Sequence, residues 1–99
     1  MTFAVSDKKV YKMIERQINN TKKDSSGNIV SFCNPGEWWS PRSANEILYD
    51  IEEAMYLYFV IVDGQKVEIK VITELTRKYL RTDPDKTTKN NLDELPDCL

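Results

Sequence analysis

The chain has 99 residues, with 14 Lys and Arg against 16 Asp and Glu, two cysteines and no histidine. This length suits one domain with a single core of at most two layers. Without histidine the chain lacks the usual base of Ser and Cys nucleophile systems and the commonest metal ligand, which disfavours most enzyme classes. A hydrophobic content of 40% with three glycines and four prolines excludes a disordered or collagen-like chain.

The apolar segments are too short for membrane insertion or secretion. The longest, residues 56–62, falls far below the ~20 residues that a membrane helix needs. Residues 1–12 contain no apolar core of a signal peptide. Cys33 and Cys98 are too few for a disulfide framework. We therefore expect a cytoplasmic protein with reduced thiols and no membrane association.

Charge varies along the chain around a net value of −2. Residues 44–68 carry one Lys against six Asp and Glu, whereas residues 69–99 carry six cationic and six acidic side chains. A nucleic-acid binder usually has a clear basic excess, so nucleic acid is not expected as a partner.

The N-terminal third predicts an arm followed by strands. Residues 1–12 are polar and predict only a loosely ordered arm, which leaves residues 13–99 as one domain. Around residues 11–19 the pattern is ambiguous, because Val10, Ile14 and Ile18 recur every four positions, which fits a helix face and also one side of a strand. A turn containing Gly27 precedes residues 28–34, which predict a further strand.

A helix is predicted after Ser40. This residue is a candidate N-cap with Pro41 in the first turn, and Ser43 with Glu46 offers a competing capping box. Apolar side chains at helical spacing form one stripe: Ala44, Ile47, Leu48, Ile51 and Met55. The acidic residues are expected on a solvated face: Asp50, Glu52 and Glu53.

A β-hairpin is predicted over residues 57–72, because Asp63-Gly64 is a strong type I′ turn signal between two apolar segments. A two-residue turn places one set of side chains on one face: Tyr58, Val60, Val62, Val67, Ile69 and Val71. A three-residue turn would shift the register by one position. In either register the first strand is apolar on both faces, which indicates an inner strand or an interface.

The remaining segments complete the predicted fold. Residues 76–83 predict a short strand, and the tail is expected to be held by Leu92 and Leu95 or to fray. The elements predict an α+β fold, with one sheet of four or five mainly antiparallel strands and one amphipathic helix on a face. The order ββαββ is compatible with a β-grasp-like topology.

The tail resembles that of a family of small uncharacterised bacterial and archaeal proteins, a domain of unknown function. The specific part is similar to KYLRTxPDxxxxNNLxxLPxC, preceded by a Trp, a short helix with an Ala-Ile pair and a hairpin with Gly at the turn. The similarity covers residues 13–98 and implies a first strand near residues 13–20. The chain departs from the pattern before the Trp, where the family tends to have a His and a Gly-Gly. The resemblance implies no biochemical activity.

The tail is the first candidate site. Its cations, aromatic ring and amides suit a phosphate or carboxylate, because Arg offers bidentate donors and Tyr a stacking face. The candidate ligand-binding residues are Lys78, Tyr79, Arg81, Lys86, Asn90 and Asn91. The alternative is a solvated strand face on which the aromatic ring packs and the asparagines cap turns.

Trp38 and Trp39 are the second candidate, since aromatic residues before a helix anchor ligands or partners. The alternative is a hydrophobic staple, with Trp39 packed on Ala44. We expect at least one Trp in the core.

The cysteines give a weaker signal. Cys33 and Cys98 cannot make a tetrahedral zinc site without other soft ligands, so no metal or cofactor is expected. Cys33 lies shortly before a helix N-terminus, where a thiol can be activated, but structural burial is favoured.

The second apolar face of the hairpin, formed by Leu57, Phe59 and Ile61, is a candidate interface with a protein partner or a second copy. The favoured function is a non-catalytic binding or protein-interaction module. The alternative is a binder of an anionic ligand, such as a nucleotide, phosphate or single-stranded nucleic acid, at residues 77–91. A small enzyme is the least favoured hypothesis.

Overall fold

The computed structural model describes residues 13–82 and 91–98, and the predicted arm at residues 1–12 lies outside them. Within this part of the chain lie seven strands, one α-helix and one 3₁₀ helix. In chain order they are β1 (Ile14–Gln17), β2 (Asn20–Lys23), β3 (Ile29–Cys33), β4 (Arg42–Ser43), α2 (Ala44–Glu52), β5 (Tyr56–Val62), β6 (Gln65–Glu74), β7 (Arg77–Thr82) and η1 (Asn91–Glu94).

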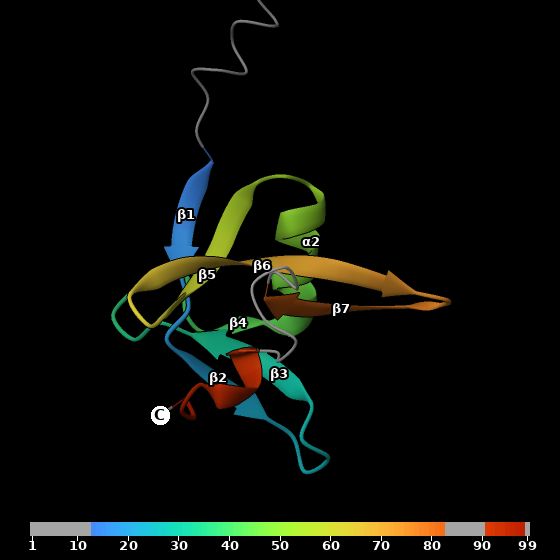
Figure 1. The fold of residues 1–99 in the computed structure, drawn as a ribbon, viewed down its shortest axis with the longest axis horizontal. Coiled ribbons are helices and arrows are strands. Elements are labelled where there is room, and N and C mark those ends of the chain that lie inside the picture. The colour runs from blue at the N-terminus through green and yellow to red at the C-terminus, as the bar shows by residue number, and fades with distance from the viewer. Residues whose placement is uncertain (1–12, 83–90, 99) are drawn as a thin grey trace, which may run out of the picture.

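The strands form two sheets, which confirms the α+β class but not the single sheet (Figure 1). The larger has the order β1-β5-β6-β7, and the smaller has the order β2-β3-β4. The pair of β1 with β5 is parallel, and all the other pairs are antiparallel. The family resemblance implied one strand near residues 13–20. Instead, the chain leaves the larger sheet after Gln17 and enters the smaller one at Asn20.

Helix α2 begins with the capping box at Ser43 rather than at Ser40. The Ser43 hydroxyl accepts a hydrogen bond of 3.1 Å from the Glu46 N–H, and the Glu46 carboxylate accepts one of 2.9 Å from the Ser43 N–H. These two bonds satisfy backbone donors that the first helical turn leaves unpaired. The helix ends at Glu52, so Met55 of the predicted stripe lies beyond it and is exposed.

The hairpin of β5 and β6 has the predicted two-residue turn. Asp63 and Gly64 have φ values of 52° and 79°, as a type I′ turn requires, and Val62 pairs with Gln65. Strand β5 lies between β1 and β6, which explains why it is apolar on both faces.

The core lies where α2 covers one face of the larger sheet, and Phe32 of β3 is part of it. We call this the inner face of that sheet. The hairpin side chains predicted to share a face lie here, and they meet side chains from the helix, from β3 and from η1. The buried cluster is Ile18, Phe32, Trp39, Ile47, Tyr58, Val60, Val67, Ile69, Leu80 and Leu92.

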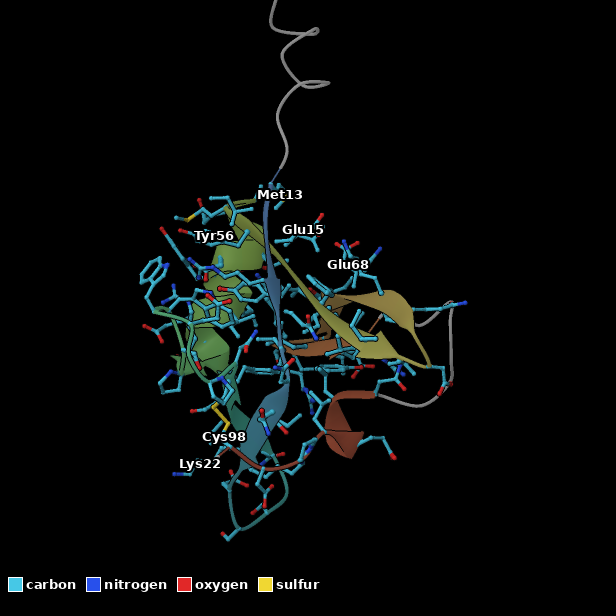
Figure 2. The ribbon with its side chains drawn as sticks, turned by 90° about the vertical axis from the view of Figure 1, so that its left-hand side faces the viewer. Met13, Glu15, Lys22, Tyr56, Glu68 and Cys98 are labelled. Atoms are coloured by element: carbon cyan, nitrogen blue, oxygen red, sulfur yellow. A yellow bond between two sulfur atoms is a disulfide. The ribbon has the colours of Figure 1, made fainter. Side chains whose placement is uncertain are left out.

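The C-terminal segment is fastened to the smaller sheet. Cys98 forms a disulfide with Cys33 of β3, so the predicted reduced thiols are wrong (Figure 2). Beside it, Thr21 accepts a backbone hydrogen bond from the Cys98 N–H at 2.9 Å and donates one to Pro96 at 3.0 Å. Leu92 is fully buried, which confirms that it holds the tail.

Candidate functional site

The cationic cluster predicted on the tail is dispersed in the structure. Lys78 Nζ pairs with Glu52 of α2 at 2.6 Å, whereas the Tyr79 hydroxyl donates to Glu74 at 3.1 Å on the opposite face of the sheet. The guanidinium of Arg77 stacks over the Tyr79 ring at 4.6 Å. Neighbouring residues of a strand point to opposite faces, so Lys78 and Tyr79 cannot close on one small anion from the same side.

The other predicted residues of this segment do not complete a site. Arg81 is half-buried and lies opposite Lys70 in the ladder of β6 and β7. The backbone N–H of Asn91 donates to the Thr82 hydroxyl at 3.2 Å, which is the turn-capping role of the alternative interpretation. Lys86 and Asn90 lie outside the described residues.

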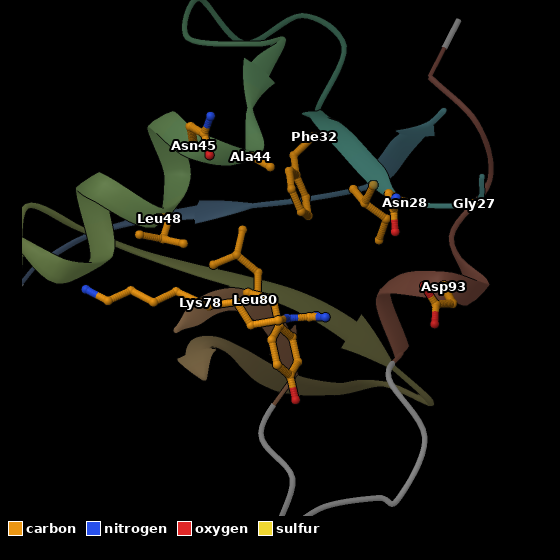
Figure 3. A pocket seen from close by; sticks show the side chains of 12 residues that line it. Gly27, Asn28, Phe32, Ala44, Asn45, Leu48, Lys78, Leu80 and Asp93 are labelled. Atoms are coloured by element: carbon orange, nitrogen blue, oxygen red, sulfur yellow. The ribbon is translucent and has the colours of Figure 1, made fainter. Parts of the chain in front are cut away.

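A cavity of about 360 Å³ does lie next to β7, between this strand, β3 and the start of α2 (Figure 3). Phe32, Leu48 and Leu80 point into it from the three elements. We call it the β7 cavity. Lys78 and Tyr79 line it, but neither Trp does.

The two tryptophans lie near β1, at the other edge of the larger sheet. Trp39 is 8% exposed and packs edge-on against Tyr58, with 6.1 Å between ring centroids. Trp38 is 84% exposed. The expectation of at least one Trp in the core is therefore confirmed.

The tryptophans surround Arg16, which sequence reasoning missed. Its guanidinium carbon lies 3.5 Å from the centroid of Tyr56, 5.1 Å from that of Trp39 and 5.3 Å from that of Trp38. The residue is 5% exposed, and its Nη1 donates a hydrogen bond of 2.9 Å to the Tyr58 hydroxyl. A single Arg in a polar segment gives no sequence signal for burial. Only the nearby Trp-Trp pair hinted at an aromatic pocket.

Tyr58 links Arg16 to a buried carboxylate. Asp50 is 1% exposed, so its prediction on a solvated helix face is wrong. The Nε and Nη2 atoms of Arg42 donate to its two oxygens at 2.7 and 2.9 Å, and the Tyr58 hydroxyl donates at 2.6 Å. These bonds explain why a charged residue is tolerated in the core.

The hydrogen bonds also set the protonation states of this network. Burial favours a higher pKa for Asp50, but the bonds from Arg42 and Tyr58 and the charges of Arg42 and Arg16 hold the pKa below its ordinary value of 3.8. Burial, together with the bond to Asp50, raises the pKa of Tyr58 to about 12. At neutral pH Asp50 is therefore ionised and Tyr58 is neutral. Arg42 has a second carboxylate partner in Glu46, at 3.7 Å, whereas Arg16 has no ion pair with a described residue.

Arg16 lines a cavity of about 480 Å³ at the β1 edge, which we call the Arg16 pocket. The other side chains around it are Ile14, Glu15, Gln17, Asn34, Glu37, Trp38, Trp39, Tyr56 and Phe59. Tyr58 is the one hydrogen-bond partner of the Arg16 side chain within the described residues, and no carboxylate lies within 4 Å of it. Glu15 pairs with Lys66, whereas Glu37, the other carboxylate of the lining, has no ion pair with any residue that the structure describes.

The predicted interface residues lie on the outer face of the larger sheet, but they differ in exposure. Phe59 is buried beneath the ammonium of Lys66, whose Nζ lies 4.7 Å from the ring centroid. Leu57 is half-buried, and Ile61 is 44% exposed. An interface here stays a prediction.

Two kinds of feature are absent from residues 13–82 and 91–98. No group of three or more Cys, Asp and Glu side chains is placed to hold a metal ion there. No helix in the same ranges combines the length and hydropathy needed to cross a bilayer.

Comparison with known proteins places the chain in a family. The family model described as "Protein of unknown function (DUF3892)" matches residues 12–96, which is most of the chain. The chain belongs to the DUF3892 family. No curated protein and no solved structure matches it. The DUF3892 description assigns no activity, so the function of this member has to be inferred from its own residues.

Proposed function

We propose that this DUF3892 chain is a non-catalytic binding module that takes an anionic ligand, a carboxylate or a phosphate, in the Arg16 pocket. The observation that carries the proposal is the state of Arg16, which is 5% exposed, lines a cavity and has no carboxylate of residues 13–82 or 91–98 within 4 Å. A buried charge is costly unless it is paired, and a bound anion would supply the missing partner.

The aromatic rings support this proposal because they orient the guanidinium. Tyr56 stacks over Arg16 at 3.5 Å, and a ring on the face of a guanidinium leaves the N–H groups in its plane free for bidentate bonds to a carboxylate or phosphate. Trp38 is 84% exposed beside the same group, so its ring can pack on the rest of a ligand.

The carboxylates near the pocket affect it in different ways. Asp50 is held by Arg42 and Tyr58 and does not reach Arg16 directly. Glu37 lines the pocket on an exposed loop and competes with an incoming anion. Removing the Glu37 charge should therefore strengthen anion binding.

The residues also favour binding over catalysis. The chain has no histidine, and the disulfide removes both of its cysteines as thiol nucleophiles. Tyr58, with its pKa raised to about 12, stays protonated at neutral pH and is a poor general base.

The same disulfide bears on where the protein functions. A stable Cys33–Cys98 bond is expected in an oxidising compartment, and this weighs against the predicted cytoplasmic location. Alkylation of free thiols in freshly lysed cells, followed by mass measurement of the intact chain, distinguishes the two locations. Two alkylated cysteines would support the cytoplasm.

The ligand proposal is tested by titrating the full chain with sodium benzoate, sodium acetate and inorganic phosphate. Binding is followed by tryptophan fluorescence and by the NMR signal of the Arg16 Nε–H. We expect at least one of these probes to bind with a Kd of order 1 mM, as is typical of a small fragment.

Three variants separate the pocket from general charge attraction. Arg16→Lys keeps the positive charge but removes the planar guanidinium, whose paired N–H groups bind an anion in bidentate fashion. This variant should weaken binding about tenfold. Glu37→Gln should strengthen binding, whereas Lys22→Gln, a loss of charge on an exposed residue of the smaller sheet, should leave it unchanged. The proposal fails if none of the probes binds, or if Arg16→Lys binds them as well as the wild type does.

A further inference from the structure

The β7 cavity lies along the edge of a strand. Four consecutive residues of β7, residues 77–80, line it. Successive side chains of a strand point to opposite faces, so four in a row can border one cavity only where it runs beside the backbone. Strand β7 is the terminal strand of the larger sheet among the described residues. The cavity therefore follows a sheet edge on which none of the described residues adds a further strand.

The opposite wall of the cavity is formed by the segment that leads into β3. Residues 27–29 line it, at the start of β3. Strand β4 is only two residues long and pairs with Ser31 and Phe32, so it does not extend along β3 as far as Ile29. The gap between β7 and the start of β3 therefore has the shape of a slot for an extended chain.

The floor of this slot is apolar, and charged residues also line it. Phe32, Leu48 and Leu80 meet at the floor, as Figure 3 shows. Arg77 lines the slot on the β7 side, and Asp93 lines it from η1. An apolar floor lined by charged residues can select a bound chain both by the spacing of its apolar side chains and by its charge.

We propose that β7 is a docking edge for an extended acidic segment of a partner protein, which adds as a further strand. Alternate apolar side chains of the segment pack on the floor, and its acidic side chains lie near Arg77 and away from Asp93. Lys78 points to the other face of β7, on the side of Leu80, and pairs there with Glu52 of α2. This site is separate from the Arg16 pocket and does not depend on it.

Charge decides against a second copy of the chain as the occupant. Strand β7 has the sequence RKYLRT, which carries three cations and no acid. Two such strands paired edge to edge would place like charges across the ladder, which is destabilising. An acidic strand has the complementary charge at the same positions.

The test uses a fluorescein-labelled peptide, acetyl-EVEVEV-amide, and the full chain, with binding followed by fluorescence anisotropy. A second peptide of the same sequence carries N-methyl groups on alternate amides, which removes the backbone donors of one edge but keeps the charge. We expect the methylated peptide to bind about tenfold more weakly, since a strand addition depends on main-chain hydrogen bonds.

Two variants with the same change of charge locate the binding. Arg77→Glu, at an exposed residue lining the slot, should weaken binding of the unmethylated peptide about tenfold, whereas Lys22→Glu on the smaller sheet should not. Amide hydrogen exchange should slow at residues 77–80 on binding. Circular dichroism confirms that both variants fold.

Several outcomes would overturn the proposal. Equal binding of the two peptides would mean that charge alone attracts them, and no binding would remove the site. A concentration-dependent dimer in light scattering that the peptide cannot dissociate, with protection of residues 77–80 in the dimer, would assign the edge to a second copy. Failure of any of these tests leaves the Arg16 pocket proposal standing.

Discussion

Tyr58 and Asp50 share a hydrogen bond of 2.6 Å, in which the phenol donates to the buried carboxylate. The same phenol accepts a bond of 2.9 Å from Arg16, so one side chain of β5 connects helix α2 to strand β1. Arg42 closes the other side of Asp50 with two hydrogen bonds. The geometry of Arg16 in its pocket therefore depends on a carboxylate that does not line the pocket.

Replacing Asp50 with Asn should destabilise the fold. The substitution removes the buried negative charge that accepts two hydrogen bonds from Arg42, and loss of one partner from a buried pair costs about 3 kcal/mol or more. Chemical denaturation of Asp50→Asn against the wild type measures the loss. The matched control is Glu52→Gln on the same helix, which breaks the exposed pair with Lys78 and should cost under about 1 kcal/mol. Equal losses in the two variants would contradict a special role of Asp50.

The pH dependence of stability should follow the same carboxylate. The folded pKa of Asp50 lies below its ordinary value of 3.8, so its contribution to the free energy of unfolding is complete above pH 3.8. This contribution is lost as the pH falls from 3.8 through the lower folded pKa. In that range the unfolded chain binds a proton at Asp50 that the folded chain does not, which favours the unfolded state. Asp50→Asn should therefore lose less stability than the wild type between pH 5 and the acid limit. Unfolding curves at several pH values measure this, and parallel decline in both proteins would refute it.

Glu46 also contributes to the loss of stability at acid pH, through the capping box at the start of α2. The Glu46 carboxylate accepts a hydrogen bond from the Ser43 N–H, and this bond lowers the pKa of Glu46 from its ordinary value of 4.5. Its contribution to the free energy of unfolding is therefore complete above pH 4.5 and is lost as the pH falls below that value. Because Glu46 is exposed, its share should be small, and Glu46→Gln serves as the reference for the effect of Asp50→Asn at acid pH.

The parts of the fold that local chemistry encodes could be predicted from the sequence. The capping box of Ser43 and Glu46 and the turn at Asp63-Gly64 involve residues within a few positions of one another. The turn also determined the register of β5 and β6, and with it the inner-face side chains. Such signals need no knowledge of the rest of the chain.

The parts that depend on distant pairing could not be predicted. Ile14 pairs in parallel with Tyr56, and this pairing splits the N-terminal segment between two sheets. The sequence around Ile14 contains no signal for this pairing, because a parallel pair depends on where a strand distant in the sequence packs. The burial of Arg16 and Asp50 is hidden for the same reason, since charged residues are assigned to the surface until their partners are known. The Arg16 pocket is assembled from elements that only the fold brings together.

The two tryptophans should differ sharply in what they contribute to stability. Trp39 is buried against Tyr58, so Trp39→Ala should cost about 3–5 kcal/mol. Trp38 is exposed, and Trp38→Ala should change stability by no more than about 0.5 kcal/mol. The same Trp38 variant should still weaken binding of benzoate in the Arg16 pocket, which separates a ligand-contacting role from a structural one. A large loss of stability in Trp38→Ala would contradict its placement.

The Cys33–Cys98 disulfide should contribute substantially to stability, because it closes a loop with a sequence separation of 65. The loop-closure model gives about 4 kcal/mol for a loop of this length, and measured values are commonly 2–4 kcal/mol. Cys98→Ser should therefore lower the free energy of unfolding by about 3 kcal/mol, and reduction of the wild type should give a similar loss. Amide exchange should quicken at Thr21 and Cys98, whose backbone bonds depend on the fastened tail, while Leu92 keeps η1 in the core. The control is Cys98→Ser under reducing conditions, whose stability should not change. If reduction leaves the wild type as stable as before, the bond does not constrain the unfolded chain as the model requires.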